Sequence, residues 1–254
     1  MAYTFSQIVA SLPPDKRNDT PWSRFVLRPL SFPAAWFFLA LGWGPNGVTY
    51  LGALFCLIGF GFLIAGPPWA VWAGLGCFFV FGVLDCADGN VARVRKTASP
   101  WGEWVDAFGG YVAYATILIG AGALSQSTSG GSLPGIPNWS LPWAGGWTLV
   151  GGVAAAANLF VRTIYQSHRA IRPDPDRSSV SREKGISNHL GITGMLLPAV
   201  AAGVALDVMP WVLTAYTVFY GGGCALVSAR LILRVEKEIR DARNPSVRSK
   251  KGRS

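Results

Sequence analysis

The chain has 254 residues, of which 51% are hydrophobic and only 14% are charged, and its net charge is +9. A chain this apolar is not a soluble domain, so the composition predicts an all-α integral membrane protein. The excess of Lys and Arg fits attraction to an anionic lipid leaflet, because no compact soluble region is left to hold nucleic acid. We therefore expect membrane lipids and not nucleic acid as partners.

The N-terminal segment, residues 1–43, contains a stretch that is not predicted to span the membrane. Residues 22–43 mix two arginines with many aromatic side chains, a pattern typical of a helix that lies in the membrane interface. Pro29 and Pro33 are expected to break this helix into pieces. The segment is thus predicted to be cytoplasmic and to carry an amphipathic interfacial helix.

Six apolar segments follow, each about long enough to cross a bilayer. They cover residues 47–66, 69–85, 104–125, 145–166, 188–207 and 209–232. We predict a six-transmembrane-helix bundle over residues 44–235 and a basic cytoplasmic tail over residues 236–254. Glycines within the spans, such as Gly59, Gly74 and Gly221 to Gly223, are expected to let helices pack closely.

The distribution of cations predicts the orientation of this bundle. All 22 Lys and Arg residues fall on one side of it, and the opposite loops, including Ser125–Trp143, contain none. Because cytoplasmic loops are enriched in Lys and Arg, we expect both termini on the cytoplasmic side of the cell membrane.

Three aspartates lie at the end of the second predicted span and the start of the third. Carboxylates at a bilayer are costly unless they face a polar cavity, a partner or a metal ion. Asp85 and Asp88 are three residues apart, which places them on one helical face with Cβ atoms about 5–6 Å apart. Asp106 can approach from the next helix and complete an oxygen-rich site of the kind that divalent cations prefer. The site would lie on the cytoplasmic side.

Written as a pattern, residues 85–106 read D-x2-D-G-x2-A-R-x8-G-x3-D, and this run resembles the CDP-alcohol phosphotransferase family of membrane enzymes. The stretch from Arg28-Pro29 to Pro45-Asn46-x2-Thr49 is also similar to that family, so the resemblance covers about residues 24–235. It implies a six-helix bundle, usually a homodimer. It also implies that Asp85, Asp88 and Asp106 hold two divalent cations, Mg²⁺ or Mn²⁺, against the pyrophosphate of a CDP-alcohol.

The activity implied by this resemblance is the transfer of a phospho-alcohol or phosphatidyl group from the CDP-alcohol to an acceptor hydroxyl, with release of CMP. Two metal ions suit such an in-line displacement, because they neutralise the pyrophosphate and stabilise the leaving group.

The other motif positions have two interpretations each. Gly89, Ala92 and Gly102 lack bulk, so a nucleotide could approach the backbone there, and Arg93 could bind a phosphate or hold an aspartate. Alternatively, the small residues only allow helix contact and Arg93 is a topology signal.

Three further residues also allow two interpretations each. Asn46 and Thr49 either cap the first span or contact the ligand. Arg162, at the cytoplasmic end of the fourth span, either binds an acceptor phosphate or marks the topology.

One position departs from the family pattern. Gly110 stands where the family has a fourth aspartate, which is taken to be a metal ligand and the general base. Glu103, three residues before Asp106 on the same helical face, is one candidate for a substitute base. Other candidates for the base are Asp106 itself, a water at the metal and the acceptor's own phosphate. The reaction could also proceed without a base.

Two alternative functions follow from this departure. The same aspartates could act on an isoprenoid diphosphate, whose ionisation needs no hydroxyl base. A protein that has lost the base could also be a catalytically disabled binding homologue. The first alternative does not require Gly89, Ala92, Arg93 and Gly102, and the second leaves seven retained motif positions unexplained.

Overall fold

The computed structural model describes residues 3–14, 19–138, 140–142, 145–171 and 191–243. Within these residues the regular elements are helices, and the only β contact is an isolated bridge between Ser132 and Ser140. The elements are α1 (Phe5–Ala10), η2 (Ser23–Leu27), α2 (Arg28–Ala40), α3 (Pro45–Ala65), α4 (Pro68–Arg95), α5 (Pro100–Ser129), α6 (Gly146–Ile171), η3 (Ile192–Leu196), α8 (Leu197–Ala205) and α9 (Met209–Arg243), where η marks a π-helical segment.

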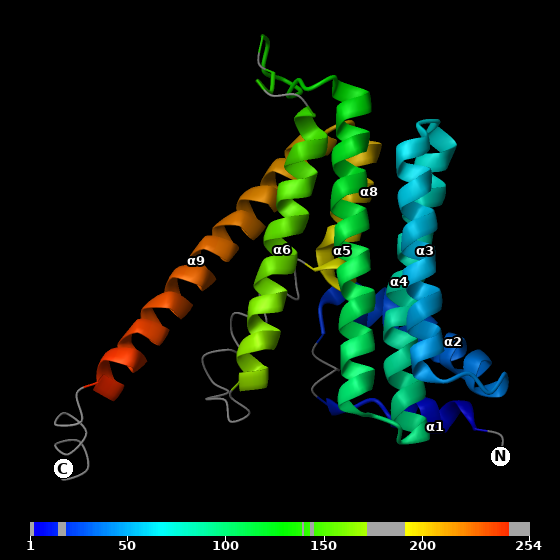
Figure 1. The fold of residues 1–254 in the computed structure, drawn as a ribbon. Coiled ribbons are helices and arrows are strands. Elements are labelled where there is room, and N and C mark those ends of the chain that lie inside the picture. Colours follow the sequence, from blue (N-terminus) through cyan, green and yellow to red (C-terminus); the bar gives the residue numbers. More distant parts are fainter. Residues whose placement is uncertain (1–2, 15–18, 139, 143–144, 172–190, 244–254) are drawn as a thin grey trace.

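Five of these helices, α3, α4, α5, α6 and α9, are long and apolar enough to cross a membrane. The chain is therefore an integral membrane protein. In Figure 1, α3 to α6 run side by side, whereas α9 leans away from them toward its C-terminal end. The short helices α1 and α2 lie at the lower end of the bundle in this view, at the same end as the last turns of α9.

The fifth predicted span differs from the other five. Its described part is an apolar helix over Ile192–Ala205, about 21 Å long at 1.5 Å per residue, against a hydrocarbon layer of about 30 Å. Gly194 interrupts it, with φ −104° and ψ −122° outside the helical region. Residues 188–190 of the predicted span lie outside the described residues, so a sixth crossing stays a prediction.

The N-terminal helix α2 is present, but the expected break at Pro33 is wrong. Pro33 lies inside a continuous helix that begins at Arg28. Ala35, Phe38 and Leu39 are buried in a cluster shared with α1, α3 and α4, and this burial offsets the one hydrogen bond that a proline removes. The position of α2 relative to the membrane interface stays a prediction.

Helix α4 continues about three turns beyond the predicted end of the second span. Its C-terminal part is held by packing, since Ala87 and Val91 are fully buried in the same cluster. The helix ends only where Lys96 adopts a left-handed conformation with φ 56°. The motif aspartates of α4 therefore lie inside a helix and not at its end.

Glycines allow close packing in part of the bundle, as predicted. A Cβ on Gly59 would lie 3.0 Å from the carbonyl oxygen of Gly74, so α3 and α4 nearly touch there. Helices α5 and α6 approach still more closely, because a Cβ on Gly151 would lie 2.4 Å from the carbonyl oxygen of Leu118. For Gly221 to Gly223 on α9 the described part of the chain gives no such contact, since none of its atoms is found within 4 Å of their Cβ positions.

The substitution Gly151→Ala is expected to destabilise the protein, because the new methyl group would meet backbone that cannot move without separating α5 from α6. We expect a loss of about 1–3 kcal/mol of stability, measured as a lower thermal unfolding temperature in detergent. Gly152→Ala is the matched control, since nothing lies within 4 Å of the Cβ position of Gly152. Equal unfolding temperatures for the two variants would contradict the observed helix contact.

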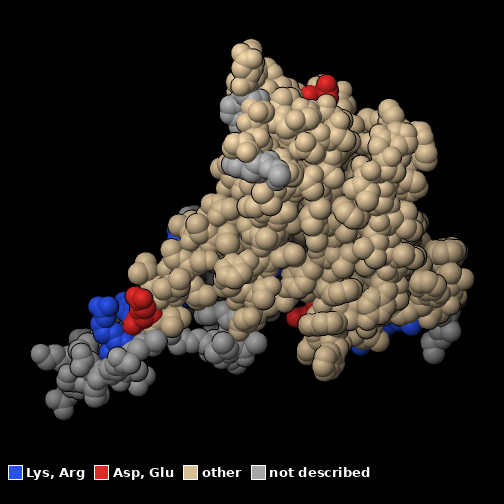
Figure 2. Space-filling model, turned by 45° about the horizontal axis from the view of Figure 1, so that its top comes forward, with Lys and Arg blue, Asp and Glu red and all other residues tan. Residues whose placement is uncertain are grey.

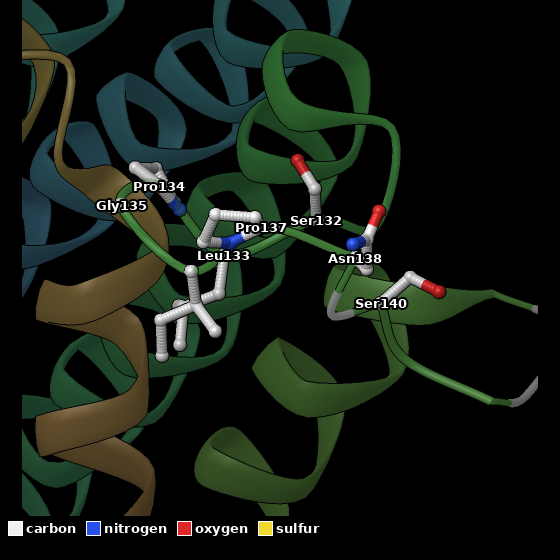
Figure 3. Close-up of a pocket in the computed structure, with 8 residues that line it drawn as sticks. Ser132, Leu133, Pro134, Gly135, Pro137, Asn138 and Ser140 are labelled. Carbon is white, nitrogen blue, oxygen red and sulfur yellow. The ribbon is translucent and has the colours of Figure 1, made fainter.

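The two ends of the bundle differ in character. On the face drawn in Figure 2, Lys and Arg side chains gather at the lower end and most of the remaining surface is uncharged. At the opposite end, the loop after α5 encloses a hollow of about 570 Å³, which is lined by residues 132–138 and Ser140 (Figure 3). Trp147 and Trp211 hold this loop by donating indole hydrogen bonds to the carbonyl oxygens of Ser132 and Pro134, at 3.0 and 2.9 Å. Its lining residues carry no charge, so we assign it no chemistry.

Candidate active site

Asp88 is the most enclosed of the motif carboxylates. Its residue is only 5% exposed, although its side chain ends in an ionisable carboxyl group. The hydroxyl of Thr49, on α3, donates a hydrogen bond of 2.6 Å to its Oδ2 atom. A Cβ on Gly109 would lie 2.8 Å from the Cγ2 atom of Thr49, so α5 also approaches this point closely. Three helices thus meet at Asp88.

The other two motif aspartates lie near enough to Asp88 to interact with it electrostatically. Asp85 is half-buried on the same helix, and Asp106 is exposed near the start of α5. Both carboxylates interact electrostatically with that of Asp88. Two further carboxyl groups therefore lie near Asp88, where α3, α4 and α5 meet.

The donor chemistry of this cluster fits a hard divalent cation. Repulsion among three carboxylates is relieved by a cation, and carboxylate oxygens are the ligands that Mg²⁺ and Mn²⁺ prefer. In the described part of the chain, no three His, Cys, Asp or Glu side chains are arranged closely enough to enclose an ion. Mg²⁺ usually binds through one or two carboxylates together with water and substrate phosphates, so an open arrangement is compatible with a site completed by substrate.

Arg93 covers the first of the small motif residues. A Cβ on Gly89 would lie 3.1 Å from the Nη1 atom of Arg93, so the guanidinium group folds back over the backbone of Gly89. The space that a flat nucleotide was expected to use at Gly89 is thus occupied by a cation in this structure. Ala92, one turn further along α4, is half-buried.

Asn46 and Gly102 lie near each other across α3 and α5, with 4.0 Å between the Oδ1 atom of Asn46 and a Cβ built on Gly102. The capping interpretation of Asn46 and Thr49 is wrong, because α3 begins after Gly44 without any side-chain cap. A side-chain cap is found on the neighbouring helix α5, where the Ser99 hydroxyl accepts a hydrogen bond of 3.1 Å from the backbone N–H of Gly102. The polar side chains of Asn46 and Thr49 are thus available to the site.

At Gly110 the structure places a cation near the position where the family pattern has an aspartate. Among the described residues packed against this position, the Nη1 atom of Arg162 lies 4.0 Å from a Cβ built on Gly110. The Arg162 guanidinium lies 4.1 Å from the ring centroid of Tyr114, and its Nε atom donates a hydrogen bond of 3.1 Å to Asn158. Glu103 and Asp106, the two candidate bases, are both exposed on α5.

The sequence matches the profile of the CDP-alcohol phosphatidyltransferase family over residues 43–219, which is more than half of the chain. The chain belongs to this family. A comparison with curated proteins finds no match. Family membership confirms the resemblance inferred from the aspartate motif and identifies the protein as a membrane transferase of substituted phosphate groups that uses a CDP-alcohol.

Several polar residues of this transferase were not singled out from the sequence. Tyr114 and Asn158 hold Arg162, and Ser31 and Asn90 belong to a buried network described below. One of these contacts had a local indication in the sequence. Asn158 and Arg162 are four residues apart in an apolar helix, and side chains at that spacing are neighbours on a helix surface.

Proposed function

We propose that the protein transfers a phospho-alcohol or phosphatidyl group from a CDP-alcohol to an acceptor hydroxyl and releases CMP, with Mg²⁺ or Mn²⁺ at Asp85, Asp88 and Asp106. The observation that carries the proposal is the gathering of these carboxylates around buried Asp88, where Thr49 from another helix holds the carboxylate at 2.6 Å. When bound, the cations would neutralise the pyrophosphate and stabilise the departing CMP.

The protein's own groups would act as follows. Thr49 fixes one oxygen of Asp88 and leaves the other for ligand binding, while Asn46 and Gly102 form one wall of the nucleotide site near it. Arg162 binds the anionic group of an acceptor such as a polyol phosphate, because it is held rigidly by Tyr114 and Asn158. This support favours the acceptor-binding interpretation of Arg162 over a topology signal alone.

The source of the general base is part of the proposal. Gly110 provides no carboxylate, so the proton of the acceptor hydroxyl is proposed to leave to Asp106 or to the acceptor's own phosphate. Glu103 lies one turn before Asp106 and is the remaining protein candidate. The variant Glu103→Gln tests it, and unchanged turnover of this variant rules Glu103 out as the base.

The proposed topology places both termini and the aspartates at the cytoplasmic face of the cell membrane, with Ile192–Ala205 as part of a sixth crossing and α2 in the interface. The gathering of Lys and Arg at one end of the visible face supports this orientation (Figure 2). A homodimer is supported by α9, of which only 6% of the apolar window is buried and whose Gly221 to Gly223 face open space.

The proposed function is tested by substrate choice. Purified protein with Mg²⁺ or Mn²⁺ is offered several CDP-alcohols and several prenyl diphosphates, and the release of CMP and of pyrophosphate is followed. We expect CMP release from a CDP-alcohol, and none from the variant Asp88→Asn. Pyrophosphate release from a prenyl donor would instead support an isoprenoid diphosphate enzyme. No product from any donor would favour a disabled binding homologue.

A further inference from the structure

A buried polar network connects helix α2 with the motif helix α4. Asn90 is fully buried, as is Ser31 on α2. The Nδ2 atom of Asn90 donates a hydrogen bond of 3.0 Å to the Ser31 hydroxyl, and the Nη2 atom of Arg93 donates one of 2.5 Å to the Oδ1 atom of Asn90. Asn90 therefore joins Arg93 to a neighbouring helix.

Hydrogen-bond chemistry fixes the direction of this network. A guanidinium group can only donate, so the Asn90 oxygen must face Arg93 and its amide nitrogen must face Ser31. The Ser31 hydroxyl donates in turn to the carbonyl oxygen of Arg28, at 2.8 Å. The side chains of Asn90 and Ser31 are thus both satisfied by one orientation of the network.

The fold anchors the far end of this network as well. Arg28 is 8% exposed and forms an ion pair with Asp19, which includes a hydrogen bond of 2.9 Å from its Nε atom. The start of α2 is therefore fixed by a charge pair, and Asn90 connects Arg93 to this fixed point. Because Asn90 and Ser31 are buried, moving either would leave a buried polar group without a partner, which is unfavourable.

The position of Arg93 on α4 gives this network a functional consequence. At about 100° per residue, Asp85, Gly89 and Arg93 follow each other along one row of the helix, with Asp88 beside it. Asn90 lies on the flank of that row, toward Ser31 of α2. It therefore holds the guanidinium at the edge of the row that carries the aspartates, above Gly89.

We propose that Asn90 is a positioning residue, which holds the guanidinium of Arg93 over Gly89 so that Arg93 binds the diphosphate of the CDP-linked substrate. This inference deepens the proposed function and rests on it. A free arginine side chain loses rotamer entropy when it binds a phosphate, so fixing the side chain before the substrate arrives improves phosphate binding. Asn90 acts only through Arg93 and does not touch the substrate.

The test is a double-mutant cycle of Asn90→Leu and Arg93→Ala in the full-length protein. Two quantities are measured: the KM for the CDP-alcohol in CMP release, and the affinity for CDP with Mg²⁺ from thermal shift in detergent. We expect Asn90→Leu to raise KM and weaken CDP binding by about tenfold, with a smaller change in kcat. In the Arg93→Ala background, Asn90→Leu is expected to change neither quantity.

Two further variants keep the test decisive. Val91→Ala removes buried methyl groups from the same part of α4 without touching the network, and we expect it to lower stability but leave KM unchanged. Ser31→Ala removes the acceptor of the Asn90 amide, together with the hydrogen bond to the Arg28 carbonyl oxygen, but leaves the bond between Asn90 and Arg93, and we expect a smaller rise in KM. Ser31→Ala replaces Asn90→Leu in the double-mutant cycle if the Asn90→Leu protein does not fold.

The inference is overturned if Asn90→Leu leaves CDP binding unchanged, or if its effect persists in the absence of the Arg93 side chain. Failure of the proposed function is a different result. Wild-type protein that binds CDP but releases no CMP from any CDP-alcohol would end the proposed function, while the affinities for CDP would still decide the role of Asn90. A wild-type protein that does not bind CDP overturns both.

Discussion

The variant Asp88→Asn is expected to lose CMP release by roughly a thousandfold or more while keeping its fold. An asparagine has the shape of the aspartate, and its oxygen can still accept the hydrogen bond of 2.6 Å from Thr49. It cannot carry a negative charge, so the site would lose the ligand that we propose for a divalent cation on its buried side. Removal of charge stabilisation at the reacting phosphate raises the barrier directly.

The same change should not lower stability, which separates a functional role from a structural one. Asp88 is 5% exposed and interacts with two further carboxyl groups, so a neutral amide at this position avoids both the desolvation of a charge and its repulsion by those groups. We expect the thermal unfolding temperature of Asp88→Asn without metal to equal or exceed that of the wild type. Addition of Mg²⁺ should raise the unfolding temperature of the wild type by mass action and should not raise that of the variant.

A matched control is available at Asp207, in the turn between α8 and α9. This aspartate is exposed and has φ 54°, a left-handed conformation that asparagine also tolerates. Asp207→Asn makes the same chemical change away from the motif, and we expect normal CMP release and a normal response to Mg²⁺. If Asp88→Asn kept a tenth or more of wild-type turnover, the proposed role of the buried carboxylate would be wrong.

The aspartate cluster was predictable from the sequence because its geometry is local. Residues three apart on a helix share a face, and a short connection brings Asp106 back to the same end of the bundle. The partners of the cluster were less predictable. Thr49 lies 39 residues before Asp88, and periodicity does not indicate that its hydroxyl would reach the carboxylate when it could also cap a helix.

Helix ends were missed for a related reason. Hydropathy marks where an apolar run stops, and it placed the end of the second span at residue 85. The helix continues to Arg95 because Ala87 and Val91 pack against α1 and α2, which is tertiary information. In the same way, nothing in the sequence indicated that Ser31 and Asn90 are buried and hydrogen-bonded to each other, because this contact depends on the packing of α2 against α4.

The second prediction with a large expected effect concerns Gly110. Restoring the family's aspartate by Gly110→Asp is expected to lower activity and not to raise it. The Cβ atom of the new side chain would lie 4.0 Å from the Nη1 atom of Arg162, so its carboxylate is expected to form an ion pair with the guanidinium inside the bundle. This pair would neutralise the cation that we propose for the acceptor's phosphate, so we expect the KM for a phosphorylated acceptor to rise by about tenfold or more.

Gly110→Ala is the matched control, because a single methyl group fits at this position with no atom nearer than 4.0 Å. We expect it to leave KM and kcat close to those of the wild type. Steady-state CMP release at varied acceptor concentration measures both variants, with Arg162→Ala as a third that should share the raised KM. A free general base typically contributes about 10²–10⁴-fold, so a gain of that size in Gly110→Asp would contradict the ion pair. Such a gain would mean that Arg162 does not pair with the new carboxylate. It would also mean that the wild-type enzyme turns over slowly because position 110 carries no carboxylate.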